Sequence, residues 1–384
     1  MNNISKLTNC YGCGACAVVC PQKIIEISET ETGFYAPRII SKDKCTNCGL
    51  CLKVCSFDQE INFDLKVNSS FASYSTNERI RQRASSGGVA FELARDALNR
   101  GYKVCGVVYD IEKQRSFHRI IENQTDLFKT IGSKYIPSAT LPSFRELISN
   151  HHQKYIVFGT PCQIASLRLL TRKYKIEQNF IFVDFFCHGV PSLKVWDKYT
   201  QKHLFKKRDI DTIKWRDKSF GWQNSYYIVG LNKEGNEIFR SKKVNDDEFF
   251  QFFLGHYALA PCCLGSCKFK RDKSFADIRL GDLWGTKYKE NSKGVSSVLC
   301  FTNKGKDLIS LNTNLANIEE NTDIVMAGQM SQNAKKPNCY NLSTILLNTK
   351  LTISQVIAII HLYEFICSIP TRIRNRILRT FVKR

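Results

Sequence analysis

The stretch CYGCGACAVVC at residues 10–20 returns as CTNCGLCLKVC at residues 45–55, and this repeat decides the fold of the N-terminal part. Both copies have the spacing C-x2-C-x2-C-x3-C. Three cysteines at this pitch lie on one tight loop and can bind three irons of a four-iron cluster, while the fourth cysteine points toward a second cluster. The spacing therefore predicts two [4Fe–4S] clusters.

Each cluster is expected to take three cysteines from one copy of the repeat and the fourth from the other copy. The first cluster then has Cys10, Cys13, Cys16 and Cys55, and the second has Cys45, Cys48, Cys51 and Cys20. Gly12, Gly14 and Gly49 allow backbone amides to approach the sulfurs. Pro21 fits a small bacterial-type dicluster ferredoxin domain, although Ser56 replaces the second proline. Two four-thiolate zinc sites are the alternative, but zinc ribbons use paired CxxC knuckles instead.

The chain length, the cysteine count and the net charge limit which kinds of protein this chain can be. At about 150 residues per domain, 384 residues favour two or three domains. The 17 cysteines do not indicate a disulfide scaffold, because the chain is long and its first residues lack the apolar core of a signal peptide. We therefore expect a cytoplasmic protein whose cysteines are thiols or metal ligands. The net charge of +21 favours acidic partners such as phosphorylated ligands.

After the cysteine repeat, apolar runs alternate with helical patterns. Strands are predicted at 103–110, 155–161, 180–187, 209–216, 225–232, 276–281 and 296–302. Helices are predicted at 87–100, 161–173, 192–205, 246–257 and 352–369. This alternation predicts an α/β (α+β) body with a mixed sheet. The expected parts are a dicluster domain at 1–57, a linker at 58–70, a body at 71–335 that divides into 71–160 and 161–335, and a C-terminal helix with a basic tail at 336–384.

Five further cysteines lie where a sheet of this kind builds its sites. Cys162 directly follows a predicted strand and Cys187 ends another, and sites in α/β sheets lie at the carboxyl ends of strands. Cys262, Cys263 and Cys267 lie on the loop PCCLGSC. Together these segments could supply four thiolates to a third cluster, whereas buried structural thiols are the alternative. Structural thiols are the favoured interpretation for Cys105, Cys300, Cys339 and Cys367.

A flavin is the usual companion of such clusters, because clusters transfer single electrons and most organic substrates need two. The fingerprints GxGxxG and GxxxxGK(S/T) are absent. Instead, the stretch SSGG opens a helix, where a serine cap and free backbone N–H groups would attract a phosphate. An ordinary capped helix is the alternative. The predicted cofactor contacts, in SSGG, GSKY and GDLWG, are Ser85, Ser86, Gly87, Gly88, Lys134 and Asp282.

These motifs together resemble a known family. The cysteine repeat is followed in order by SSGG, GSKY, GTPCQIASLR, CHGVPS, RDKSFGW, PCC…CKF and ADIRLGDLWG. From about Cys10 to Gly285 the chain resembles the coenzyme F420 hydrogenase/dehydrogenase beta-subunit family. It is similar to free-standing bacterial members with an N-terminal ferredoxin domain, which often accompany enzymes of polysaccharide biosynthesis.

The resemblance implies an iron–sulfur flavoprotein that passes electrons between clusters, FAD and a partner or substrate. It implies a flavin-binding body and a third [4Fe–4S] cluster on Cys162, Cys187, Cys263 and Cys267. Coenzyme F420 is a further candidate substrate or cofactor. The loop departs from the family pattern, because C-x2-C is expected before K-F and Leu264 stands at the first position. Either Cys262 or Cys263 could therefore be the ligand.

Two functions remain open. We expect an oxidoreductase acting on a small-molecule, phosphorylated or sugar substrate, with His188 as proton donor because reduction of a carbonyl or alkene also needs protons. A structural histidine is the alternative. The second function is an electron-transfer subunit that docks to a partner enzyme without its own substrate site. A redox partner protein or reduced ferredoxin is expected in both cases, and nucleic acid is not expected, because the body lacks a basic stripe with interleaved aromatics.

The segment from Thr371 to Arg384 carries six basic residues and no acidic residue. With the helix before it, this tail could lie on an anionic membrane, so peripheral association with the inner membrane surface is a second expected location. A packed final helix with a solvated basic end is the alternative.

Overall fold

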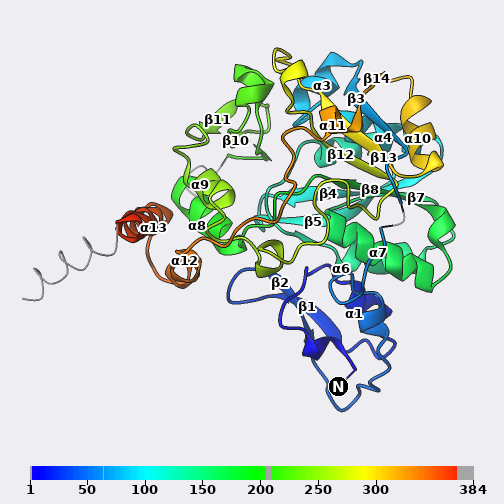
Figure 1. Cartoon of the computed structure of the whole chain (residues 1–384), viewed down its shortest axis with the longest axis horizontal. Helices are drawn as coiled ribbons and strands as arrows, with labels where there is room; N and C mark the ends of the chain where they lie inside the picture. Colours follow the sequence, from blue (N-terminus) through cyan, green and yellow to red (C-terminus); the bar gives the residue numbers. More distant parts are fainter. Residues whose placement is uncertain (1, 64, 205–208, 370–384) are drawn as a thin grey trace, which may run out of the picture.

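The computed structural model of the chain describes residues 2–63, 65–204 and 209–369, which form a body with a smaller N-terminal part at one end (Figure 1). The body is built on a nine-stranded mixed sheet. In spatial order its strands are β14 (Leu315–Glu319), β3 (Ser69–Ser75), β13 (Ser296–Cys300), β12 (Ile278–Asp282), β8 (Phe180–Phe185), β7 (Tyr155–Phe158), β4 (Lys103–Asp110), β5 (Arg115–Ile121) and β6 (Ser138–Ala139). The predicted α/β body with a mixed sheet is confirmed.

The centre of the sheet is parallel, because β12, β8, β7 and β4 run in the same direction. These strands are rich in apolar residues, as expected for strands covered on both faces. Tyr155 and Val157 of β7 share a core with α6 (Leu141–Ser149) and α7 (Pro161–Lys173), whereas Ile156 shares a core with α4 (Val89–Asn99). The carboxyl ends of β7 and β8 lie at the same edge of the sheet, and the segments that follow them meet there.

The N-terminal part contains one small unit twice. α1 (Ala15–Val19) and α2 (Leu50–Lys53) each begin after a glycine with positive φ, Gly14 at 76° and Gly49 at 73°. Between them, β1 (Ile25–Glu29) and β2 (Tyr35–Ile39) form an antiparallel hairpin. Apolar side chains of α1 and α2 share a core with α6 and α7, so this part sits on one face of the body.

A second core gathers α8 (Leu193–His203), α9 (Glu248–Leu254), α12 (Tyr340–Leu347) and α13 (Ile353–Ser368). Beside it lies a small antiparallel sheet of β11 (Glu237–Arg240), β10 (Val229–Leu231) and β9 (Thr212–Lys214). Thr352 begins α13 in a capping box with Gln355, so the predicted final helix is confirmed. The predicted basic tail lies outside the described residues. Among the residues described, no helix is both long and apolar enough to cross a membrane.

The remaining helices of the body are short. They are α3 (Glu78–Arg83), α5 (Gln124–Leu127), α10 (Asn303–Ser310) and α11 (Thr322–Val325). Apolar residues of α5 and α10 share the core with α4, on the face of the sheet opposite α7.

Some local expectations are wrong or shifted for identifiable reasons. β7 ends at Phe158, before the predicted end at 161, because Pro161 begins α7. The expected serine cap of α4 is wrong, because Gly88 is the N-cap residue at φ 89° and no side chain caps the helix. Residues 58–63 of the predicted linker lie against the body, where Ile61 and Phe63 contact an apolar cluster and the ring centroid of Phe63 is 5.8 Å from that of Phe269.

Candidate redox site

The structure brings together the four cysteines predicted for the first cluster. Burial raises the pKa of the Cys10, Cys13 and Cys16 thiols, and the charge of the nearby Cys55 thiolate raises each of them further. Cys55 belongs to the second copy of the repeat. These four residues combine three cysteines of the first copy with one of the second. We call them the first N-terminal set: Cys10, Cys13, Cys16 and Cys55.

The four cysteines predicted for the second cluster also lie together. Cys20, Cys45, Cys48 and Cys51 line one small cavity with Asn2 and Asn3. Asn3 Nδ2 donates a hydrogen bond to Cys45 Sγ at 3.4 Å. A hydrogen bond from the backbone N–H of Leu50 lowers the pKa of the exposed Cys48 thiol. These four cysteines form the second N-terminal set.

The donor chemistry of both sets suits iron–sulfur clusters. Each set consists of four thiols, which is the usual complement for a [4Fe–4S] cluster. In the described part of the chain, no three His, Cys, Asp or Glu side chains converge as a single metal ion requires. Four-iron clusters bind each thiolate to a different iron, so their ligands lie further apart than those of one zinc ion. A β-carbon at Gly12 would lie 2.4 Å from the carbonyl oxygen of Tyr35, so the close-fitting loop needs glycine there.

The body brings four more cysteines together. Burial raises the pKa of the Cys162 thiol, and the charges of Cys187, Cys263 and Cys267 raise it further. Cys162 follows β7, Cys187 follows β8, and the other two lie at and after the short 3-10 turn Pro261–Cys263. We call these four residues the body set. Lys270 Nζ donates hydrogen bonds to the carbonyl oxygens of Cys187 and His188 at 2.8 and 3.0 Å, so a cation lies beside the thiols.

The adjacent thiols of Cys262 and Cys263 are not equivalent. The hydrogen bond between the two thiols raises the pKa of Cys262 and lowers that of Cys263, and burial raises the pKa of Cys262 further. The ammonium of Lys270 also lowers the pKa of Cys263. Charge interactions with Cys187, Cys267 and the Lys270 ammonium place Cys263 beside the rest of the body set.

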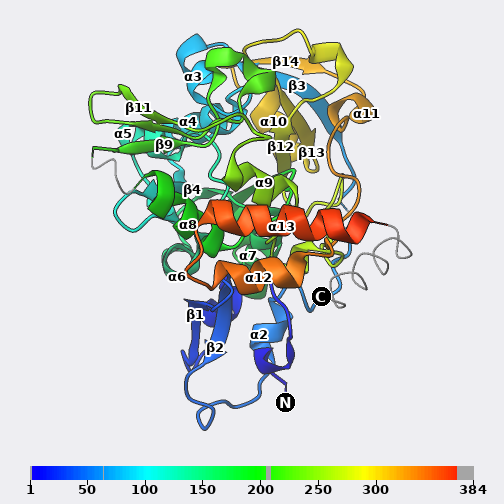
Figure 2. The same cartoon turned by 90° about the vertical axis from the view of Figure 1, so that its left-hand side faces the viewer.

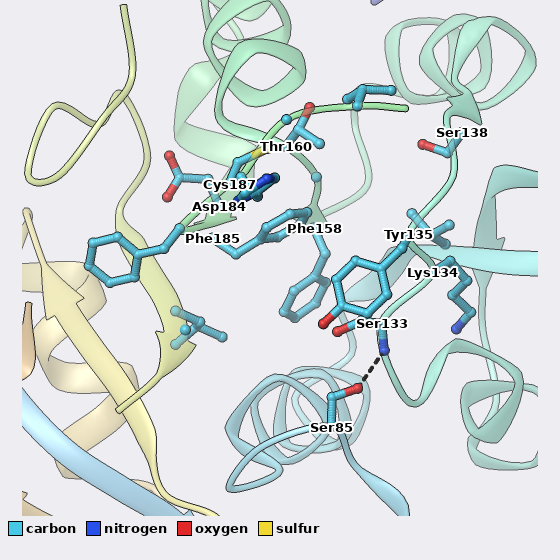
Figure 3. A pocket seen from close by; sticks show the side chains of 18 of the residues that line it. Ser85, Ser133, Lys134, Tyr135, Ser138, Phe158, Thr160, Asp184, Phe185 and Cys187 are labelled. Atoms are coloured by element: carbon cyan, nitrogen blue, oxygen red, sulfur yellow. Dashed lines mark hydrogen bonds between the residues drawn. The ribbon is translucent and has the colours of Figure 1, made fainter. Parts of the chain in front are cut away.

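A cavity of about 530 Å³ adjoins the body set. This volume lies within the range of about 300–1,000 Å³ that is usual for small-molecule sites. Cysteines from two sets line it: Cys10 of the first N-terminal set, and Cys162, Cys187 and Cys263 of the body set. Figure 3 shows Cys187 and Thr160, from the ends of the parallel strands, together with Ser85, Ser133 and Tyr135 around this cavity.

The start of α4 lies at the wall of the cavity. Ser85, Ser86 and Gly88 line it, and the backbone N–H groups of Val89 and Ala90 have no acceptor among the described residues. Ser85 Oγ instead accepts a hydrogen bond from the backbone N–H of Ser133 at 2.8 Å (Figure 3). Free N–H groups at a helix start attract an anion, because the helix dipole adds positive potential there.

Gly87 has a packing role instead of a position at the cavity. Its N–H donates to Ser296 Oγ at 3.0 Å, and a β-carbon would lie 2.5 Å from the carbonyl oxygen of Ser73. Gly87 is absent from the cavity lining of the described chain, unlike Ser86 and Gly88. The glycine therefore allows the loop to pass closely over β3 and β13.

Lys134 and Asp282 line the cavity, but both have internal partners. Lys134 Nζ donates to the carbonyl oxygens of residues 129–132 at 2.8–3.2 Å, and burial lowers its pKa to about 7. Asp282 accepts hydrogen bonds from Trp222 Nε1 at 2.8 Å and from Arg216 at 3.1 Å. Trp222, which is fully buried, stacks on Trp284 with a centroid distance of 5.1 Å. These residues shape the wall of the cavity.

His188 also lines the cavity, beside the body set. Its Nε2 lies 3.2 Å from the carbonyl oxygen of Phe253. Burial lowers the pKa of His188 to about 4, so the imidazole is neutral at pH 7. A neutral imidazole can donate a hydrogen bond, but it does not act as a charged acid there.

Sequence reasoning missed the side chains that support the loops around the cavity. Lys218 donates to the carbonyl oxygens of Arg81, Ser86 and Lys293, and thereby joins the SSGG loop to a second loop. Arg216 is fully buried and lies over the ring of Tyr226 at 4.1 Å. Both residues belong to the motif RDKSFGW, from which the sequence analysis singled out no basic residue.

Comparisons with known proteins agree on one family. Residues 70–145 and 152–325 match the N-terminal and C-terminal regions of the coenzyme F420 hydrogenase/dehydrogenase beta subunit, and residues 9–59 match a 4Fe-4S dicluster domain. The coenzyme F420-dependent sulfite reductase of Methanocaldococcus jannaschii is 28% identical over 326 residues, which cover 80% of this chain. The match covers 46% of that relative, so the chain spans about half its length.

A chain of the F420-reducing [NiFe] hydrogenase complex from Methanosarcina barkeri, solved as a xenon derivative, has 18% sequence identity and a TM-score of 0.49. That match covers 68% of this chain and 84% of the other.

Proposed function

The chain belongs to the coenzyme F420 hydrogenase/dehydrogenase beta-subunit family and carries a 4Fe–4S dicluster domain, and from this premise we propose that it is an iron–sulfur flavoprotein oxidoreductase. It would pass electrons between [4Fe–4S] clusters, FAD and a small-molecule substrate. One observation carries the proposal: thiols of the first N-terminal set and of the body set line the same cavity as the start of α4. The proposed cluster ligands and the helix start that could bind an anion therefore lie around the same cavity.

In this proposal each N-terminal set holds one cluster, and the body set holds a third. When bound, the clusters supply one-electron transfer and the flavin converts between one-electron and two-electron chemistry. Lys270 offsets the negative charge of the body set, and its two backbone hydrogen bonds keep its ammonium beside Cys187. Cys263 is the proposed ligand, because it lies beside Cys187, Cys267 and the Lys270 ammonium, and Cys262 forms a hydrogen bond with it.

The proposed flavin contacts use backbone groups more than side-chain charges. The unpaired N–H groups of Val89 and Ala90 would bind a phosphate, and Ser85 fixes the loop through its bond to Ser133. Tyr135 and Trp284 provide aromatic walls for a planar ring. Lys134 keeps the turn at residues 129–132 in place, which makes its part in binding indirect.

Tyr11 lies between the first N-terminal set and the body set. Its ring centroid is 5.3 Å from that of Phe57 and 5.9 Å from that of Phe269. Burial raises the pKa of Tyr11, and the charges of Cys162 and Cys267 raise it further. These aromatic contacts join the two sets. His188 donates its N–H at Nε2 to the carbonyl oxygen of Phe253, so Nδ1 of the neutral imidazole is left as a hydrogen-bond acceptor for a substrate in the cavity.

Anaerobic purification with iron, sulfide and flavin quantified tests this proposal. We expect one flavin and about twelve irons per chain, since each of three clusters contains four. A content of about eight irons would contradict the third cluster but would agree with two clusters in the dicluster domain. An iron-replete protein that neither contains nor binds flavin would contradict the proposal.

The second candidate is an electron-transfer subunit that docks to a partner enzyme. The observation in its favour is that the chain corresponds to only 46% of the sulfite reductase that it matches. Reduction of an artificial dye, together with stable co-purification of one protein and no turnover of any small molecule, would favour this candidate. Turnover of coenzyme F420 or of a phosphorylated sugar would favour the enzyme with its own substrate site.

A further inference from the structure

The last helix of the described chain, α13, is apolar on nearly its whole circumference. Its 16 residues, ISQVIAIIHLYEFICS, contain one charged side chain, Glu364. That carboxylate turns toward the body, where it accepts a hydrogen bond from the Tyr257 hydroxyl at 2.7 Å. Surface helices of globular proteins normally carry charged residues on the solvent side, so α13 is unusual.

One face of α13 is packed and another is exposed. Ile353, Val356 and Ile360 are buried in the core with α8 and α9. Leu362 is 58% exposed and Phe365 is 64% exposed. Figure 2 shows α13 lying lengthwise across one side of the molecule with α12 beside it.

The packed face fixes α13 to the body. Lys198 Nζ donates to the carbonyl oxygens of Thr349 and Leu351, which precede the helix, and Ser354 bonds to Glu248 at 2.7 Å. On α12, which packs against α13, Ile345 is 65% exposed. We call Ile345, Leu362, Phe365 and Ile366 the apolar flank.

The sequence that follows the apolar flank is strongly basic. Residues 370–384, which lie outside the described residues, include five arginines and one lysine and no acidic residue. An apolar helix face next to clustered basic residues matches the two attractions of an anionic bilayer, burial of apolar side chains and attraction to lipid headgroups. A second copy of this chain would bring a further net charge of +21, and like charges oppose that contact.

We propose that the apolar flank is a docking surface for an anionic membrane, on which α13 lies parallel to the surface. At about 1.5 Å per residue, its 16 residues span about 24 Å, which is shorter than the hydrocarbon core that a spanning helix must cross. The flank inserts its apolar side chains at the headgroup boundary, and the basic sequence that follows α13 makes an anionic bilayer the favoured one. This inference does not depend on the proposed redox function.

Vesicle flotation of the anaerobically purified full chain tests the proposal. We expect binding to vesicles that contain phosphatidylglycerol, weaker binding at high salt, and little binding to pure phosphatidylcholine. Leu362→Glu and Phe365→Glu should each weaken the binding about tenfold, because each places a charge at the headgroup boundary. Leu311→Glu, at a residue 66% exposed on another part of the body, should bind as the unsubstituted chain does.

Unchanged iron and flavin contents of the variants show that the body remains folded. Binding by Phe365→Glu that equals binding by Leu311→Glu would overturn the proposal, as would equal binding to both vesicle types. Light scattering without lipid tests the main alternative, which is a dimer of this chain formed through the apolar flank. A dimer that Phe365→Glu dissociates, together with no vesicle binding, would assign the flank to a protein contact and overturn the membrane proposal.

Discussion

The N-terminal sets and the body set each bring four thiols together, but they are built in different ways. In each N-terminal set, three cysteines come from one copy of the repeat, and the fourth lies at the end of the short helix of the other copy. The body set instead draws on three segments between residues 162 and 267, which meet at the ends of two parallel strands. Local spacing therefore specifies the N-terminal sets, whereas only the folded sheet assembles the body set.

Because the body set depends on the folded sheet, a substitution that destabilises the body core should also disrupt the arrangement of its four thiols. Asp184 and Arg279 form a fully buried ion pair at 2.7 Å, and Arg279 also donates to the carbonyl oxygens of Phe269 and Arg271, just after Cys267. Asp184→Ala leaves the guanidinium buried without its partner and should cost about 3–5 kcal/mol of unfolding free energy. Urea unfolding followed by tryptophan fluorescence measures this loss, because all four tryptophans lie in the body.

Asp323→Ala provides the matched control, because Asp323 pairs with Arg271 at an exposed position. Loss of this exposed ion pair should change the free energy of unfolding by less than about 1 kcal/mol. Equal effects of Asp184→Ala and Asp323→Ala would show that the buried pair does not support the body.

The second prediction separates the adjacent cysteines. Cys263→Ser should lower the iron content from about twelve to about eight per chain, because one four-iron cluster loses a ligand. Cys262→Ser should leave the iron content unchanged, since Cys263 is the one that lies beside Cys187, Cys267 and Lys270. Iron analysis and low-temperature spectroscopy of the remaining clusters provide the measurement, and a reversed order of the two variants would assign Cys262 as the ligand.

The third prediction concerns the cavity without touching a cysteine. Lys218→Met removes the hydrogen bond to Ser86 of the SSGG loop and those to Arg81 and Lys293 that tie this loop to its neighbours, so flavin affinity should fall about tenfold to a hundredfold. Iron content should remain unchanged, because none of the hydrogen-bond partners of Lys218 in the described chain is a cysteine. Lys287→Met, at an exposed lysine paired with Glu320, should leave flavin affinity unaltered. A flavin titration compares the variants, and equal affinities would remove Lys218 as a positioning residue.

The smallest expected effect is a pH dependence of the body. Burial lowers the pKa of His118 to about 4 in the folded chain, from about 6.5 when unfolded. Between these values the unfolded chain binds more protons, so stability falls as the pH falls from about 6.5 toward about 4. His118→Gln should therefore lessen the loss of unfolding free energy between pH 7.5 and 5.5 by about 1 kcal/mol. Parallel curves for both chains would exclude His118 as the cause.

The same contrast explains what could be predicted from the sequence. β4 and α7 have the predicted bounds, because their apolar patterns and the Pro161 start are local signals. β3, with the sequence SSFASYS, was not predicted, since it becomes a strand by pairing with β13 and β14 on either side. The serine cap failed because the positive φ of Gly88 makes this glycine the N-cap.

The candidate site divides along the same line. Cysteine spacing predicted which thiols would be neighbours in the N-terminal sets, and strand ends pointed to Cys162 and Cys187. No spacing could reveal Lys218 or Lys270, because their partners are backbone carbonyls of segments far away in the sequence. Supporting residues of this kind become visible only in the folded chain.

The way the N-terminal part is seated on α7 has a kinetic consequence. The Ser56 hydroxyl donates to the carbonyl oxygen of Cys162 at 3.1 Å and receives a hydrogen bond from the Ser166 hydroxyl at 2.7 Å. Lys268 donates to the carbonyl oxygens of Phe57 and Gln59, both at 2.7 Å. In the proposed function, these contacts let an electron pass between the N-terminal part and the body at fixed positions, with no diffusional search. Solvent viscosity then slows only the encounter with an external donor, and the internal step keeps its own rate.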